Sequence, residues 1–168
     1  MKTPTISIIA AIDEEKGIGE ENKIPWDIPD DRKWFKEKTF GHVVIMGKNT
    51  YQSILNFLGK PLSGRINIVV TSDRTLKGKD DLYFVNNIDS SLALATKLEK
   101  NGEIFFIGGA KIYNSAIDFA DRLYLALVKG KYNCDTFFPD HSNFKKTVYS
   151  KKGRSDKYKY EFKILEKS

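Results

Sequence analysis

Apolar, β-branched runs alternate along this chain with segments of helical pattern, and this alternation limits the fold more than any other feature. Residues 5–12, TISIIAAI, form a nearly continuous apolar run, which is typical of a strand buried on both faces. Further strands are expected at 42–46, 66–72, 81–85, 103–109 and 122–128. Helices are expected between the strands, near 28–39, 48–58, 88–102 and 110–120. The pattern predicts an α/β fold, with a mixed, mostly parallel sheet covered by helices on both faces.

The C-terminal part of the chain predicts an antiparallel hairpin at the end of this sheet. Two strands are expected there, around 146–150 and 158–166, joined through KKGRSD. Earlier in the chain, Gly102 is expected to end the helix predicted at 88–102. Since the chain contains no linker, repeat or low-complexity segment, we expect a single domain over residues 1–168.

Composition and charge narrow the class of protein. The chain is 40% apolar and 30% charged, as in ordinary globular domains, and no apolar run approaches the roughly 18–20 residues that cross a bilayer. The single Cys134 excludes an internal disulfide, so we expect a cytoplasmic protein that does not contact the membrane. His42 and His141 lack neighbours at ligand spacing, and no metal site is expected.

The net charge of +6 favours anionic partners. Much of the excess lies late in the chain, in residues 144–168. A solvated lysine-rich surface is the favoured interpretation, because no nucleic-acid-binding module is recognisable. We therefore expect a phosphorylated cofactor or an acidic small substrate, and no nucleic acid. A monomer is expected because the predicted elements leave no apolar stripe over.

Two segments, VVIMGKNTY and FFIGGAKIY, share a strand–glycine–helix design. Free N–H groups at a helix start bind anions, and ligands of open α/β folds lie at the carboxyl ends of strands. Lys48 and Thr50 add a charge and a hydroxyl to the first segment, and Gly108 and Gly109 let a ligand approach the second. A nucleoside-triphosphate phosphate loop is rejected, because His42 replaces the required glycine; no G-x-G-x-x-G is present either.

The stretch KIPWDIPDDRKWFK, residues 23–36, places a carboxylate on an apolar helix face. Pro29 suits the first helical turn, and Asp27 is expected to cap it. Asp31 follows Ile28 by three residues and precedes Phe35 by four, so the three side chains share one stripe. Either the helix dipole favours this acid, or a ligand satisfies it.

The order and spacing of several blocks resemble dihydrofolate reductase nearly end to end: GIGEENKIPWDIPDDRKWFK, VVIMGKNTYQSI, LSGRINIVVTS, IFFIGGAKIY, RLYLALV, DTFFPD and YEFKILE. The resemblance implies the fold of that family, an eight-stranded sheet with about four helices. It also implies NADPH-dependent reduction of 7,8-dihydrofolate to tetrahydrofolate, which supplies one-carbon carriers for thymidylate and purine synthesis. A hydride would go to C6 and a proton to N5, and antifolates would bind as inhibitors.

The resemblance assigns roles to three catalytic candidates. Asp31 would bind a pterin ring nitrogen and the 2-amino group, Trp26 would help to fix a water beside it, and Tyr113 would lie near the nicotinamide. Burial should raise the pKa of Asp31 above about 3.9. The loop GIGEENKI would close over the nicotinamide.

The substrate contacts implied are Ile9, Ala10, Ala11, Arg32, Phe35, Ile54, Arg65 and Ile107, with Arg65 on the glutamate α-carboxylate. The cofactor contacts implied are Ala11, Ile18, Gly19, Gly47, Lys48, Asn49, Thr50, Thr71, Ser72, Arg74, Gly108, Gly109, Ala110, Lys111, Ile112 and Tyr113. Lys48, Ser72 and Arg74 would select NADPH through its 2′-phosphate.

The sequence departs from the family pattern at three positions. Ala126 stands where a threonine commonly braces the catalytic carboxylate, and Ile24 replaces a common methionine or leucine. Arg32 replaces an apolar substrate contact, and we expect it to reach toward the glutamate tail. Arg32 and Ala126 together are expected to weaken the binding of small apolar antifolates more than the binding of dihydrofolate.

Two rival interpretations remain at this level. One is a related pterin or pyrimidine reductase, such as that of riboflavin synthesis, which would require neither Asp31 nor the Pro25–Trp26 pair. The other is a non-catalytic module that binds nucleotide or RNA. Salt-sensitive binding of nucleic acid would support this interpretation.

Overall fold

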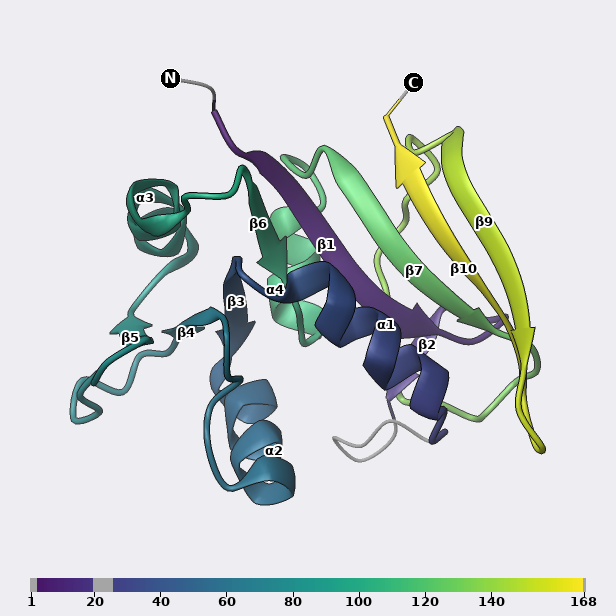
Figure 1. Cartoon of the computed structure of the whole chain (residues 1–168), viewed down its shortest axis with the longest axis horizontal. Coiled ribbons are helices and arrows are strands. Elements are labelled where there is room, and N and C mark those ends of the chain that lie inside the picture. The colour runs from purple at the N-terminus through teal and green to yellow at the C-terminus, as the bar shows by residue number, and fades with distance from the viewer. Residues whose placement is uncertain (1–2, 20–25, 168) are drawn as a thin grey trace.

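The computed structural model describes residues 3–19 and 26–167. Its centre is an eight-stranded sheet with the order β5-β4-β3-β6-β1-β7-β10-β9 (Figure 1). The strands from β5 to β7 in this order pair in parallel, and β10 and β9 continue the sheet antiparallel. Their bounds are β1 Thr5–Ile12, β3 Val43–Gly47, β4 Ile66–Val70, β5 Leu82–Val85, β6 Glu103–Phe106, β7 Arg122–Val128, β9 Lys146–Arg154 and β10 Lys159–Glu166. The predicted mixed, mostly parallel sheet with a C-terminal hairpin is confirmed.

Four helices cover the sheet on both faces, as predicted: α1 Pro29–Thr39, α2 Lys48–Leu58, α3 Ile88–Leu98 and α4 Ala110–Ala116. In Figure 1, α1 lies in front of the sheet and α4 behind it. Strand β1 shows why, because its side chains alternate between two apolar clusters: Ile8 and Ile12 pack with residues of α3 and α4, whereas Ile9 packs with residues of α1 and α2. No helix in the described part of the chain is long and apolar enough to cross a bilayer.

The helix ends differ from the predictions in three places. Asp27 does not cap α1; the N-cap residue is Ile28, which makes no side-chain cap hydrogen bond, and Asp27 pairs with Arg32 instead. Helix α3 stops at Leu98, so Gly102, with a φ of +84°, lies in the turn before β6 and not at the helix end. Helix α4 ends at Ala116 and is shorter than the predicted 110–120.

Two short strands were missed by the sequence analysis. Strand β2, Gly17–Gly19, pairs antiparallel with β8, Thr136–Phe137, in a separate two-stranded sheet. At three and two residues, they are too short for any apolar periodicity to reveal them. Strand β9 also runs on to Arg154, beyond the predicted range of 146–150.

Helix α1 is fixed against the C-terminal half of the sheet by aromatic packing. Trp34 stacks on Phe162 of β10 with ring centroids 4.6 Å apart and an interplanar angle of 13°. The hydroxyl of Tyr160, also in β10, donates to the carboxylate of Asp30. These contacts hold the first turn of α1, and with it Asp31, at a fixed place over the sheet.

Candidate active site

Asp31, at the start of α1, is a carboxylate whose side chain has no hydrogen-bond partner among the described residues. Its backbone N–H donates to Ile28 O at 3.0 Å, but within the described residues no group hydrogen-bonds to its side chain. Burial raises the pKa of Asp31 from 3.8 to about 6, because desolvation disfavours the charged form. The predicted rise of this pKa is confirmed. An acid in such a setting is one that a ligand can satisfy.

The apolar residues predicted around this acid lie together in one cluster on the α1–α2 side of the sheet. Its members among the predicted residues are Ile9, Ala11, Trp26, Phe35, Ile54 and Ile107. Ala10 packs into the cluster on the opposite face, because neighbouring strand residues point to opposite sides. The side chain of Ala10 therefore points away from Asp31, and only the main chain of Ala10 can contact a ligand on the Asp31 side.

Trp26 contributes a second polar atom without a partner. Its ring is 5% exposed and packs edge-on against Tyr132, with centroids 5.5 Å apart. Its indole Nε1 is buried and has no hydrogen-bond partner among the described residues. Trp34 Nε1 is buried in the same way, and a water or a ligand can supply the acceptor that such an N–H requires.

Arg65 is a buried cation, 6% exposed, at the end of the same apolar region. Its Nε donates to Ser63 O at 3.0 Å and one terminal nitrogen donates to Thr39 Oγ1 at 3.2 Å. Its guanidinium carbon lies 6.0 Å from the centroid of the Phe35 ring. Within the described residues Arg65 has no carboxylate partner. A guanidinium held in this way can receive an acidic group of a ligand through its remaining donors.

The two glycine turns meet at the carboxyl ends of β3 and β6. Gly47 N donates to Gly108 O at 2.9 Å, and a Cβ placed on Gly109 would lie 3.7 Å from Thr50 Oγ1. A side chain at Gly109 would therefore fill the space next to this hydroxyl. The predicted convergence of the two segments on one edge of the sheet is confirmed.

Tyr113 links β1 and β6 at this edge. Its hydroxyl lies 2.9 Å from Ile9 O and 3.0 Å from Ile107 O, two carbonyls that accept hydrogen bonds. Burial raises the pKa of Tyr113, and the charge of Asp31 adds to the rise. The hydroxyl is therefore a neutral group bound to the main chain and not an available acid.

Lys48 and the segment after β4 form a charged corner at the same edge. Lys48 Nζ lies 3.2 Å from the carboxylate of Asp73. Hydrogen bonds from Thr75 and Lys48 lower the pKa of Asp73 to about 2. The sequence analysis missed Asp73, which holds the lysine near the predicted residues Thr71, Ser72 and Arg74.

The remaining predicted residues lie around these groups or outside the described part of the chain. Asn49, Ser72, Arg74 and Lys111 are exposed, whereas Gly19, Gly108 and Ile112 are buried and Ile18, Gly47, Thr50, Thr71, Gly109 and Ala110 are half-buried. Arg32 is exposed and paired with Asp27, so its reach toward a ligand tail stays a prediction. Ala126 is 1% exposed in the cluster of Ile9 and Ile107. Residues 20–24 of the predicted closing loop, which include Ile24, and Pro25 after it lie outside the described residues.

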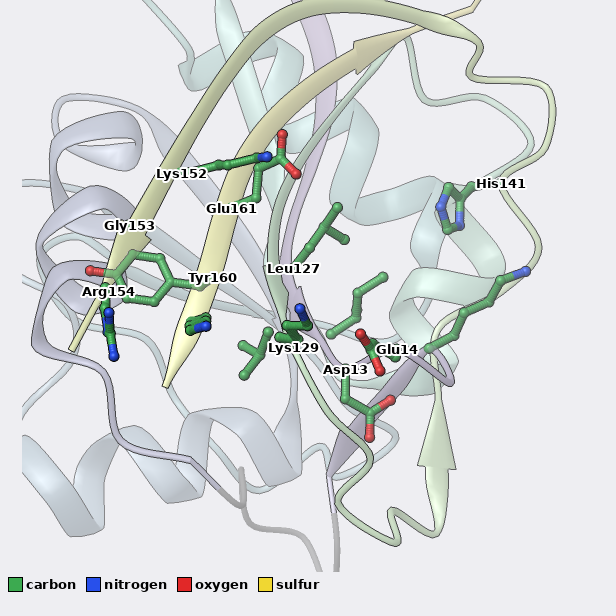
Figure 2. Close-up of a pocket in the computed structure, with 14 residues that line it drawn as sticks. Asp13, Glu14, Leu127, Lys129, His141, Lys152, Gly153, Arg154, Tyr160 and Glu161 are labelled. Carbon is green, nitrogen blue, oxygen red and sulfur yellow. The ribbon is translucent and has the colours of Figure 1, made fainter. Parts of the chain in front are cut away.

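A hollow of about 950 Å³ lies elsewhere, along β7, β10 and β9. Figure 2 shows it with Lys152 and Arg154 on β9, Lys129 directly after β7, and His141 on a neighbouring loop. It contains charges of both signs and none of the residues predicted to bind substrate or cofactor. The hollow is therefore separate from the candidate active site.

The chemistry of the candidate site fits a flat, partly apolar ligand with an acidic tail. Asp31 offers acceptors for ring N–H groups, the apolar cluster offers a surface for rings, and Arg65 offers donors for a carboxylate. The corner of Lys48 and Thr50 offers a charge and a hydroxyl for a phosphate.

Comparison with known proteins identifies the family. The model of the dihydrofolate reductase family matches residues 5–167. The dihydrofolate reductase of Bacillus subtilis (strain 168) is 40% identical over 169 residues, which cover 96% of this chain and 94% of that protein. That of Buchnera aphidicola subsp. Acyrthosiphon pisum (strain APS) is 39% identical over 165 residues, with 95% and 98% covered.

A solved structure agrees with the sequence relatives. Dihydrofolate reductase from Enterococcus faecalis, in complex with NADP(H) and RAB-propyl, superposes with a TM-score of 0.84 and 28% identity, covering 98% of this chain and 96% of that one. The chain therefore belongs to the dihydrofolate reductase family.

Proposed function

We propose that this protein reduces 7,8-dihydrofolate to 5,6,7,8-tetrahydrofolate and that Asp31 is the acid that binds the pterin. Dihydrofolate reductases are NADPH-dependent oxidoreductases, and the chain is a member of that family. The observation that carries the assignment of Asp31 is a carboxylate on the apolar face of α1 with no partner in the described protein. The pterin ring nitrogen and 2-amino group are donors that suit this acceptor.

The raised pKa of Asp31 supports its role in the proton transfer. With a pKa of about 6, Asp31 keeps its proton in about a tenth of the molecules at pH 7, far more often than an unperturbed aspartate does, and this proton lies close to the pterin. Trp26 lies in the apolar cluster of Ile9 and Phe35, and its buried Nε1 has no hydrogen-bond partner among the described residues. Its N–H would hold a water between indole and substrate, which gives that proton a path toward N5.

The residues at the sheet edge fit a phosphorylated dinucleotide. Gly47 and Gly109 leave the backbone open to a pyrophosphate, and Thr50 offers a hydroxyl beside Gly109. Lys48, held by Asp73, would meet the 2′-phosphate with Ser72 and Arg74. When bound, NADPH supplies the hydride for C6, and the protein holds the two rings in contact and excludes water.

Arg65 would pair with the α-carboxylate of the substrate's glutamate. Its contacts with Thr39 and Ser63 fix the plane of the guanidinium, so a bidentate pair costs little further ordering. Arg32, exposed and one residue beyond Asp31, would reach the outer part of the same tail.

The direct test follows NADPH absorbance on addition of 7,8-dihydrofolate, with NADH in a parallel assay. Rapid oxidation of NADPH and slower oxidation of NADH are expected. No oxidation by the wild-type protein would contradict the proposal. An antifolate should block the reaction, and gel filtration and a nucleic-acid binding assay would test the predictions of a monomer without nucleic-acid affinity. A cytoplasmic location stays a prediction.

A further inference from the structure

Asp13 is a buried carboxylate that the proposed mechanism does not use. The residue is 4% exposed and lies directly after β1. One oxygen, Oδ1, accepts from the backbone N–H groups of Glu15 at 2.8 Å and Gly17 at 2.7 Å. The other, Oδ2, accepts from the backbone N–H of Tyr132 at 3.2 Å and lies 3.7 Å from the thiol of Cys134. Each oxygen therefore holds a different segment of the chain.

The first segment is the turn that leads into β2. Gly17 N binds Asp13, and Lys16 before it has a φ of +64°, a conformation that is uncommon for lysine. The turn thus depends on hydrogen bonds for its shape. Beyond it come Ile18 and Gly19, which the resemblance to dihydrofolate reductase implies as cofactor contacts.

The second segment runs from residue 132 to β8 and packs directly on β2. A Cβ placed on Gly17 would lie 2.6 Å from both Cβ and Sγ of Cys134, so the Cys134 side chain packs against the main chain of Gly17 at a distance that a larger residue would not allow. The pairing continues with Asp135 N, which donates to Gly19 O at 3.0 Å. Asp13 therefore joins the start of β2 and the segment that supports it. Asp13 also lines the hollow that Figure 2 shows.

We propose that Asp13 is a positioning residue for hydride transfer, because it fixes β2, and with it Ile18 and Gly19, beside the nicotinamide site. This inference rests on the proposed function. It assigns Asp13 no contact with either ligand. Its effect should therefore fall on the cofactor and on the hydride step, and not on dihydrofolate, whose proposed partners Asp31 and Arg65 belong to other segments.

The test is an Asp13→Asn variant, which separates the hydrogen bonds of Oδ1 to the local turn from the contacts of Oδ2 with the second segment. An amide retains one acceptor oxygen, and the two N–H donors of the local turn should keep it. The amide N–H₂ then faces the N–H of Tyr132 and the thiol of Cys134, where it cannot accept. The turn is preserved and the link to the second segment is lost. The matched control is Glu14→Gln, because Glu14 is the exposed neighbour of Asp13 and the charge change is the same.

The readouts are the single-turnover hydride-transfer rate, the Kd of NADPH and the Kd of dihydrofolate. We expect Asp13→Asn to lower the hydride-transfer rate by about fivefold to a hundredfold and to weaken the binding of NADPH. The Kd of dihydrofolate should stay within about twofold of the wild-type value. Glu14→Gln should leave all three quantities at their wild-type values. A rate and an NADPH Kd that match the wild type would overturn the proposal. An equal loss of affinity for both ligands would also overturn it, because it would indicate general damage.

A rescue variant keeps the inference falsifiable if Asp13→Asn is less stable. Adding Cys134→Ser to Asp13→Asn places a hydroxyl oxygen, a good acceptor, opposite the new amide. The double variant should recover most of the lost hydride-transfer rate. If it recovers none, the proposal that Asp13 links β2 to the second segment is contradicted. Failure of the proposed function itself is recognised separately, since the wild-type protein would then not oxidise NADPH with dihydrofolate.

Discussion

Replacement of Asp31 by asparagine should make the free protein more stable in mildly alkaline solution, although it should remove the activity. The fold raises the pKa of Asp31 from 3.8 to about 6, so it favours the neutral acid over the carboxylate. The free energy of unfolding is therefore unaffected by this group below pH 3.8, and the penalty grows as the pH rises through the range up to about 6. Above that range the penalty is complete.

Its magnitude follows from the two pKa values. At about 1.4 kcal/mol for each pH unit, the difference between 3.8 and about 6 corresponds to about 3 kcal/mol at pH 8. The same linkage gives about 1 kcal/mol at about pH 4.5. The asparagine amide has its own desolvation cost, about 1 kcal/mol, but this cost is the same at both pH values. The stability gained by Asp31→Asn should thus be about 2 kcal/mol larger at pH 8 than at pH 4.5.

Urea unfolding of wild type and Asp31→Asn at the two pH values, without ligands, measures this difference. Asp27→Asn is the control, because Asp27 is exposed and its ion pair with Arg32 lies on the surface, where such pairs contribute about 0.5 kcal/mol. A gain from Asp31→Asn that is equal at both pH values, or a loss at pH 8, would refute the claim that Asp31 is a desolvated acid without a partner.

Three further variants test the ligand assignments. Arg65→Lys should raise the KM of dihydrofolate by about tenfold to a hundredfold and leave kcat nearly unchanged, because lysine cannot form the bidentate pair; steady-state kinetics with a substrate lacking the glutamate should show no such change. Lys48→Gln should raise the KM of NADPH by about tenfold and leave that of NADH unaltered, and an equal rise for both would exclude a contact with the 2′-phosphate. Arg32→Leu combined with Ala126→Thr should tighten inhibition by a small apolar antifolate more than it lowers the KM of dihydrofolate, and an unchanged ratio would remove this hypothesis.

The long elements of the fold were readable from the sequence because their apolar patterns reflect burial. The range of α2, Lys48–Leu58, was predicted residue for residue, since Gly47 and Gly59 bound an amphipathic run. Helix α4 was overextended because the apolar residues after Ala116 belong to a turn that packs on the same cluster. Strands β2 and β8 were not readable, since their pairing depends on contacts between distant segments.

In the candidate site, too, features that depend on neighbouring residues were predicted, whereas contacts between distant segments were not. Asp31 was recognised from its place on an apolar stripe, and the two glycine turns from their strand–glycine–helix order. Local sequence did not reveal the Asp73 partner of Lys48 or the four donors around Asp13. The Lys48–Asp73 pair and the contacts of Asp13 with Tyr132 and Cys134 join segments that only the folded chain brings together. The prediction that Asp27 caps α1 was wrong because the neighbouring Arg32 competes for its carboxylate.

The most direct test of the central claim, that the substrate is the partner of Asp31, is the hydride-transfer rate of Asp31→Asn with NADPH and 7,8-dihydrofolate at neutral pH. A fall of about a hundredfold or more, with the Kd of NADPH unchanged, is the predicted result. A rate close to that of the wild-type protein would contradict the account, because the buried carboxylate would then have no part in binding or protonating the pterin.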